Sequence, residues 1–450
     1  MQRAFSDASR RLLGLFAVEA GALVTLFGLY KAGDVRSLFT TKFAVLAITG
    51  VGLIALGIAR VLQHPVPRRA FGIAVVANVV SVALAVGAAE IALRALARTT
   101  MEGTTIGNVA IRPTWSELVE QVRTMPPSDQ TFFTYDAELG WTVGPNRHGG
   151  DGLYYSSVEG IRSAKPDVSY AAETPKYRVA LIGDSNAFSL EVSFEDSWGY
   201  QLGRVLGSEV QVLNFGVDGY GIDQIYLRYL RDVRPWHPRV VVVGFIQHDL
   251  MRSMAVYPFV SLGWPRYLTK PRFDLSDGGM VIVNRPLPTP AEIARATAPA
   301  DLPFIAYDPG FVDQEWEWRF DRGPVLLRFV TSLSPRWPHT PPLGRADTQA
   351  LNSRLLNELV GAIERDGARP MLVYLPHWIG SDELALSTLQ RSGLPYRNMT
   401  ECLTDVPADQ RRVPSGGHYT GIANTALAEC VAPEVRCGLA ASTCDVQPGH

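Results

Sequence analysis

Cysteine and unbalanced charge are the features that this sequence most clearly lacks. Its 450 residues include four cysteines, and 42 Lys and Arg against 44 Asp and Glu give a formal net charge of −2. Balanced charge implies neither a basic surface for nucleic acid nor an acidic surface for cations. We find no internal repeat, and the length is sufficient for two or three domains.

The cysteines are confined to the end of the chain, at Cys402, Cys430, Cys437 and Cys444. An even, clustered set without metal-ligand spacing predicts disulfides, and hence an oxidising compartment. We expect the pairs Cys402–Cys430 and Cys437–Cys444, because the second closes a short loop. No metal and no other cofactor is implied.

Long apolar runs, by contrast, are present near the amino end, at Leu12–Tyr30, Phe43–Ala59 and Phe71–Leu93. Each is close to the length of ~20 residues that is needed to cross a bilayer core, so the sequence predicts three transmembrane helices within residues 1–99. The first run alone is also compatible with a signal peptide, but its length and the two further runs favour a retained anchor. Buried core helices are the other alternative.

Positive charge is spread almost evenly over the two sides of these runs. Six arginines, at positions 3, 10, 11, 60, 68 and 69, fall on one side, and Lys31, Arg36, Lys42, Arg94 and Arg98 on the other. This slightly favours an inside amino terminus. Three spans then place the large domain outside the cytoplasm, in agreement with the cysteines.

The remainder predicts an α/β fold, a three-layer sandwich with a parallel sheet. Residues 100–176 form a Pro/Gly-punctuated connector with short strands. Residues 177–435 form the main domain, interrupted by a Pro- and Trp-rich insertion at 251–345, either a lid or a packed irregular subdomain. Residues 436–450 form a tail. The expected strands are residues 178–183, Val210–Leu213, Val240–Phe245 and Pro370–Leu375, and the expected helices are Trp198–Leu206, Asp223–Arg231, Asp347–Arg365 and Ile422–Cys430.

Ser185 is the candidate nucleophile, because Gly183-Asp184-Ser185 ends the first apolar strand at the sheet edge where such folds place their chemistry. Serine needs a base to take its proton. His418, in a Gly-rich loop before the last helix, is the preferred base, and His377 after a strand is the alternative. A Gly-rich segment follows the second strand, and Gln247-His248-Asp249 follows the third.

These blocks, in this order, resemble the SGNH/GDSL hydrolase superfamily over about residues 177–435. The resemblance implies a flavodoxin-like sheet and an ester hydrolase or acyltransferase, with Ser185 and His418 as catalytic residues. The resemblance places Gly219, in the segment Asn214–Gly221, at the oxyanion-hole glycine, so that Ser185, Gly219 and His248 are the expected oxyanion-hole residues. Asp184, Asp249 and Ser415 are candidate supporting residues. The connector motifs, residues 135–141 (Tyr-Asp-Ala-Glu-Leu-Gly-Trp) and 159–162 (Glu-Gly-Ile-Arg), resemble membrane-tethered bacterial members.

Two positions depart from that family's pattern. His248 stands where the family has asparagine, and a histidine N–H can still donate to an oxyanion. Ser415 stands where the family has the aspartate that orients the base, so a backbone carbonyl or another acid, such as Asp405 or Asp409, has to substitute.

Three functions are compatible with this pattern. The first is a multi-pass protein of the bacterial inner membrane with an extracytoplasmic, periplasmic serine esterase or O-acyltransferase domain. It would act on acylated glycans or lipids of the envelope. The second is an impaired relative that binds or scaffolds envelope polysaccharide. The third, a transport or assembly subunit, is disfavoured by the scarcity of ionisable residues within the spans. The oligomeric state is left open.

Overall fold

The computed structural model describes residues 17, 21, 49, 51–56, 68–100, 103–107, 109–111, 113–125, 130–262, 267–276, 279–313, 316, 323–332, 344–376, 382–414 and 417–440. The chain divides into two compact units, residues 1–97 with 324–326, and residues 98–323 with 327–450.

In the first unit the main described element is a long helix, α3 (Arg68–Leu96). Its segment Val79–Leu96 has a mean hydropathy of 1.9 and contains no buried residue, and α3 is the one helix among the described residues that is long and apolar enough to cross a membrane. It matches the third predicted run. The first two predicted runs lie mostly outside the described residues, so three transmembrane helices remain a prediction.

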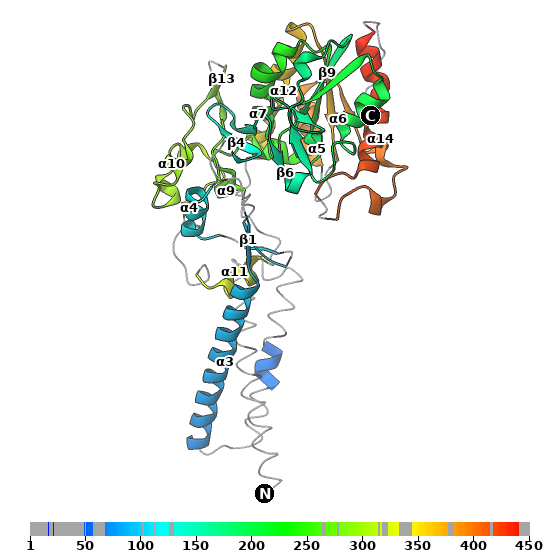
Figure 1. The fold of residues 1–450 in the computed structure, drawn as a ribbon. Coiled ribbons are helices and arrows are strands. Elements are labelled where there is room, and N and C mark those ends of the chain that lie inside the picture. The colour runs from blue at the N-terminus through cyan, green and yellow to red at the C-terminus, as the bar shows by residue number, and fades with distance from the viewer. Residues whose placement is uncertain are drawn as a thin grey trace. The chain divides into compact units, whose positions relative to one another are not determined.

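The second unit is built around a five-stranded sheet of order β10-β9-β11-β14-β15 (Figure 1). All four strand pairings are parallel, as the sequence predicted. The strands are β9 (Tyr177–Gly183), β10 (Val210–Asn214), β11 (Val240–Phe245), β14 (Arg369–Tyr374) and β15 (Tyr396–Asn398). Only β15, a three-residue edge strand, was missed by the sequence analysis.

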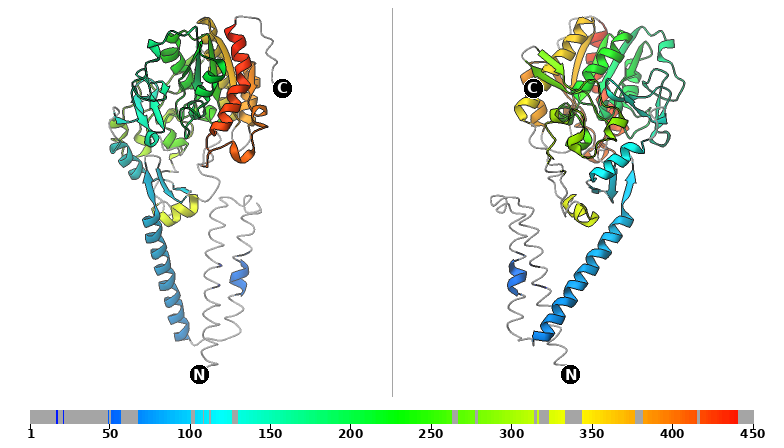
Figure 2. Two further views of the ribbon diagram at one scale, coloured as in Figure 1. Left: turned by 45° about the vertical axis from the view of Figure 1, so that its right-hand side comes forward. Right: turned by 90° about the vertical axis from the view of Figure 1, so that its left-hand side faces the viewer.

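Strand alternation sends successive side chains of the sheet into two separate apolar cores. Val179 and Leu181 of β9 pack with α6 (Trp198–Leu206) and α14 (Gly421–Leu439) on one face. Ala180 and Ile182 belong to the core on the other face. Figure 2 shows α14, in red, running along one side of the sheet. The chain therefore forms the predicted three-layer sandwich.

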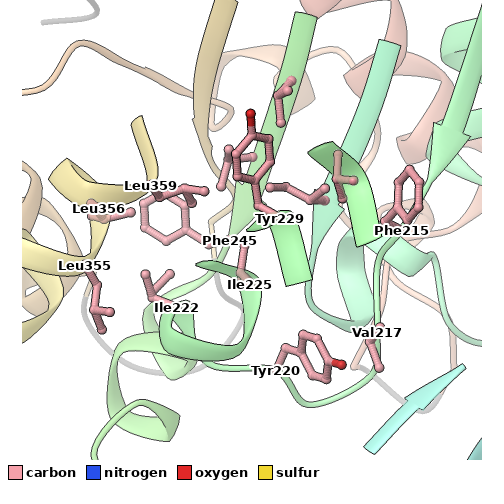
Figure 3. Packing of buried hydrophobic residues seen from close by; sticks show 14 of the residues in the cluster. Phe215, Val217, Tyr220, Ile222, Ile225, Tyr229, Phe245, Leu355, Leu356 and Leu359 are labelled. Carbon is pink, nitrogen blue, oxygen red and sulfur yellow. The ribbon is translucent and has the colours of Figure 1, made fainter. Parts of the chain in front are cut away.

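The second face is covered by α7 (Ile222–Arg228), α12 (Arg345–Arg365) and α13 (Glu383–Ser392). Figure 3 shows the leucines of α12 meeting Phe245 of β11 and the apolar side of α7. Leu355, Leu356 and Leu359 are fully buried there, which explains why the spacing of apolar residues identified α12 from the sequence.

The last helix is longer than predicted. It continues past the expected end at Cys430 to Leu439, into the segment that the sequence assigned to a tail. Val431, Val435 and Leu439 stay on its buried face, so the apolar stripe that stabilises the helix does not end at Cys430. Cys402 and Cys430 form the predicted disulfide. The second predicted pair includes Cys444, which lies outside the described residues.

The predicted connector and the predicted insertion both pack into this unit. The connector contains α4 (Trp115–Arg123) and the short strands β1 (Arg98–Thr100), β2 (Gly103–Ile106), β3 (Val109–Ile111), β4 (Phe133–Asp136), β5 (Gly140–Val143), β6 (His148–Gly149), β7 (Tyr154–Ser156) and β8 (Arg162–Ser163). Helix α8 (Gln247–Arg252) leads into the insertion, which contains α9 (Pro258–Ser261), β12 (Phe273–Ser276), β13 (Gly279–Ile282), α10 (Pro290–Ile293) and α11 (Val325–Ser332); residues 324–326 are grouped with the first unit.

Much of the insertion has its own apolar core. Tyr257, Phe259 and Ile293 pack there against Leu118 and Val122 of α4. Of the two alternatives left open by the sequence, the packed subdomain therefore describes this part of the insertion.

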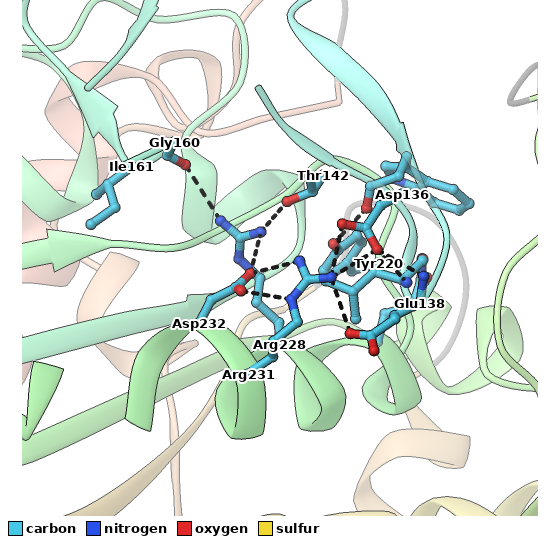
Figure 4. A network of polar contacts seen from close by, with 12 residues as sticks. Asp136, Glu138, Thr142, Gly160, Ile161, Tyr220, Arg228, Arg231 and Asp232 are labelled. Carbon is cyan, nitrogen blue, oxygen red and sulfur yellow. Dashed lines mark hydrogen bonds and ion pairs between the residues drawn. The ribbon is translucent and has the colours of Figure 1, made fainter. Parts of the chain in front are cut away.

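Arg228, at the end of α7, and Arg231, just after it, attach the connector to this helical segment (Figure 4). Arg231 donates to both carboxylate oxygens of Asp136 at 2.8 Å. Arg228, which is buried, donates to the Thr142 hydroxyl and forms an ion pair with Asp232 at 3.2 Å. The connector is therefore held by partly buried polar contacts as well as by apolar packing.

The Asp136 contacts make stability depend on pH in the acid range. Burial alone raises the pKa of Asp136, but hydrogen bonds from Arg231 and from two backbone N–H groups outweigh it, so that the pKa is lowered from 3.8. Such a group stabilises the fold fully above its unfolded-state pKa and loses that contribution as pH falls through the folded-state pKa.

We expect Asp136→Asn to lower the unfolding free energy near neutral pH by roughly 1–3 kcal/mol. In denaturant titrations, its difference from wild type should shrink below about pH 4. Asp409→Asn, at an exposed position, is the control and should change neither the unfolding free energy near neutral pH nor its dependence on pH. A difference that persists undiminished in strong acid would contradict this assignment.

Candidate active site

The sheet presents Ser185 at the carboxyl end of its central strands. β9 ends at Gly183, and the short helix α5 (Ser185–Phe188) starts two residues later. The Asp184 carboxylate caps this helix by accepting the N–H of Asn186 at 2.9 Å. The cap fixes the turn, and Ser185 becomes the first helical residue at the edge where parallel sheets place their ligands.

The structure brings Ser185 together with His418, although 233 residues separate them. Ser185 Oγ lies 2.9 Å from His418 Nε2. Arg412 holds the histidine loop, because its guanidinium lies 3.7 Å from the Tyr419 ring centre and donates to the carbonyls of Gly417 at 3.2 Å and Pro376 at 2.5 Å. The alternative base, His377, lies outside the described residues.

A third group completes the arrangement, and the sequence analysis missed it. Glu191 Oε2 lies 2.5 Å from His418 Nδ1. When Nδ1 carries the proton, its N–H donates a hydrogen bond to this carboxylate, and Nε2 is left as an acceptor for the Ser185 hydroxyl. Ser185, His418 and Glu191 thus have the geometry of a Ser-His-acid triad.

The sequence analysis named Asp405 and Asp409 as examples of an acid that orients His418, and the structure shows a different acid there. Asp405 and Asp409 are exposed, and Ser415 lies outside the described residues. Glu191 is instead the acid that contacts His418. The signal for it was positional: a loop that leaves α5 starts at the sheet edge that holds Ser185, so an acid in that loop is close to the nucleophile.

The glycine-rich segment lies against the nucleophile turn. A Cβ atom on Gly216 would lie 2.3 Å from the Phe188 nitrogen, which leaves room only for glycine. Gly219 has φ +76°, in the left-handed region that favours glycine. Val217 N–H donates to the Gly183 carbonyl at 3.1 Å. The loop is therefore near Ser185, as an oxyanion hole requires, and that role for Gly219 remains a prediction.

The first connector motif holds this loop in place. Trp141 Nε1 donates to the Asp218 carbonyl at 2.9 Å, and the Tyr220 hydroxyl donates to the Trp141 carbonyl at 2.6 Å. Trp141 and Tyr220 are both fully buried. Trp141 thus contacts the glycine loop at two points, through its indole N–H and through its carbonyl, and the two hydrogen bonds fix the loop backbone.

The segment Gln247-His248-Asp249, which follows the third predicted strand, contributes to a buried cluster of charged residues. Arg252 lies 2.6 Å from Asp249 and 3.4 Å from Asp184, and both carboxylates are fully buried. Burial, followed by the charge of Asp184, raises the pKa of Asp249 well above its usual range. Asp184 and Asp249 are thus joined through Arg252 beside the nucleophile. His248 is half-buried in the first turn of α8, and its donation to an oxyanion remains a prediction.

No family model matches the chain, and no curated protein matches it. Solved structures similar to it include TesA, with 12% identity over 58% of this chain and 99% of that one, at a TM-score of 0.32. A lipolytic protein of the G-D-S-L family from Desulfitobacterium hafniense shows 13% identity over 57% and 98%, at 0.30. A mutant of Axe2, an acetyl-xylooligosaccharide esterase from Geobacillus, shows 12% identity over 58% and 94%, at 0.30.

At these identities and scores, none of the neighbours assigns an activity to this chain. The chemistry has to be inferred from its own residues.

We expect Gly216→Ala to damage the site, because the added methyl group would displace α5 or the glycine loop. Labelling of Ser185 by a fluorophosphonate should slow at least about tenfold, with a stability loss of roughly 1–3 kcal/mol. Gly203→Ala in α6 is the matched control, since its Cβ would meet Val212 at an ordinary 3.6 Å. Equal labelling of both variants would show that the close contact at Gly216 is unimportant.

Proposed function

We propose that residues 98–440 form a serine ester hydrolase or O-acyltransferase that works through an acyl-enzyme. The observation that carries this proposal is the continuous hydrogen-bonded chain from Glu191 through His418 to Ser185, with distances of 2.5 and 2.9 Å. A buried serine that has both a base and an oriented acid is arranged for nucleophilic attack.

In the proposed reaction, Ser185 Oγ attacks the ester carbonyl while His418 Nε2 accepts the hydroxyl proton. Negative charge develops on the carbonyl oxygen, and the amides of Ser185 and Gly219, with His248, donate to it. His418 then returns the proton to the leaving alkoxide, which departs as an alcohol. Water or an acceptor hydroxyl attacks the acyl-enzyme as His418 takes its proton, and His418 gives this proton to Ser185 Oγ as the serine ester bond breaks and the acid or new ester leaves. Glu191 stabilises the imidazolium at each stage.

The proposed setting is a bacterial envelope, with the catalytic domain anchored by α3 and the preceding apolar runs. The apolar segment Val79–Leu96 supports anchoring, and the Cys402–Cys430 disulfide supports an oxidising, extracytoplasmic location. In this setting O-acyl esters of envelope glycans or lipids are the proposed substrates. The replacement of the family asparagine by His248 is the observation that favours the alternative, a protein that binds such glycans without turning them over.

Fluorophosphonate labelling of the full-length protein separates the two functions. Wild type should be labelled and should hydrolyse p-nitrophenyl acetate, whereas Ser185→Ala should do neither. His418→Ala and Glu191→Gln should slow labelling by about 10²–10⁴-fold, because each removes the activation of the serine. Asp409→Asn, an exposed acid close to His418 in sequence, is the control and should match wild type.

A folded wild-type protein that neither reacts with fluorophosphonate nor hydrolyses any ester in a broad panel would favour the binding protein. In that case His248→Asn should restore some reactivity if this position disabled the site.

A further inference from the structure

The loop that carries Glu191 has an unusual backbone. Ser189 and Glu191 adopt φ values of +62° and +66°, in the left-handed region, although neither is glycine. Such conformations persist only where surrounding contacts over-determine them. Something outside the loop must therefore hold the Glu191 backbone in place.

Arg162, from the second connector motif, supplies the first set of these contacts. Its guanidinium donates to the carbonyls of Phe188 at 2.6 Å and Ser189 at 2.8 Å, before Glu191, and of Val192 at 2.7 Å and Ser193 at 3.2 Å, after it. The residue is 1% exposed. Burial lowers its pKa to about 10, which leaves it charged at neutral pH.

Tyr154, from β7, supplies the contact to Glu191 itself. Its hydroxyl accepts the Glu191 N–H at 2.6 Å. The tyrosine ring packs 5.4 Å from the Phe188 ring, and the Arg162 guanidinium lies 5.2 Å from the tyrosine ring centre. Arg162 thus holds the backbone before and after Glu191, and Tyr154 holds the amide of Glu191 itself.

We propose that Tyr154 and Arg162 are positioning residues that set the Glu191 carboxylate against His418, so that the connector is part of the catalytic apparatus. This inference rests on the proposed esterase function. Apolar packing would leave these carbonyls without donors, whereas the planar fork of the guanidinium satisfies all four and fixes them in one geometry on both sides of Glu191.

Tyr154→Phe tests the inference with the loss of one oxygen atom. In the full-length protein, kcat for p-nitrophenyl acetate should fall about 5–30-fold with KM within about twofold, because the acid is misplaced while the ester site is intact. Tyr155→Phe, the same substitution on the other face of β7, should match wild type. Arg162→Lys should lower kcat further, since an ammonium cannot hold four carbonyls at once.

A double-mutant cycle distinguishes positioning from general damage. In a Glu191→Ala background, where the acid is already absent, Tyr154→Phe should change the residual labelling rate by less than about twofold. A full-size effect in that background, or an unchanged kcat for Tyr154→Phe and Arg162→Lys in the wild-type background, would overturn the inference. An inactive wild type would instead refute the proposed function, so the two failures are distinguishable.

Discussion

The hydrogen bond between Glu191 and His418 is the contact on which the rest of the site depends. It joins residues 227 apart in sequence and leaves the histidine ready to accept the Ser185 proton. The contact exists only because two loops meet at one edge of the sheet. Three features bring these loops together: the parallel order of the strands, the close fit of Gly216 against α5, and the hydrogen bonds from Arg412 to the histidine loop.

The connector links this constraint to the rest of the chain. Its two motifs, recognised in the sequence only as a resemblance, contact different parts of the site: Trp141 holds the glycine loop, and Arg162 holds the Glu191 loop. The compact unit that holds the site therefore begins at Arg98, not near residue 177, where the sheet begins. Both motifs are buried because each satisfies main-chain groups that would otherwise be costly to bury.

Sequence reasoning predicted the parts of the fold that local patterns determine. The bounds of α6 and β11 were correct, since amphipathic spacing and a Val-rich run are local signals. Ser185 and His418 were located by the order of blocks along the chain. Glu191 was missed because its loop conformation is imposed by distant contacts from Tyr154 and Arg162, and no local pattern encodes them.

The most direct test of the account is the proton between Glu191 and His418. A ¹H spectrum of the full-length protein, recorded with ¹⁵N-labelled histidine, should show an imidazole Nδ1–H resonance far downfield of the amide protons. It should persist in Ser185→Ala and disappear in both Glu191→Ala and His418→Gln. A wild-type spectrum without that resonance, or one in which it survives the loss of Glu191, would contradict the claim that Glu191 orients the base.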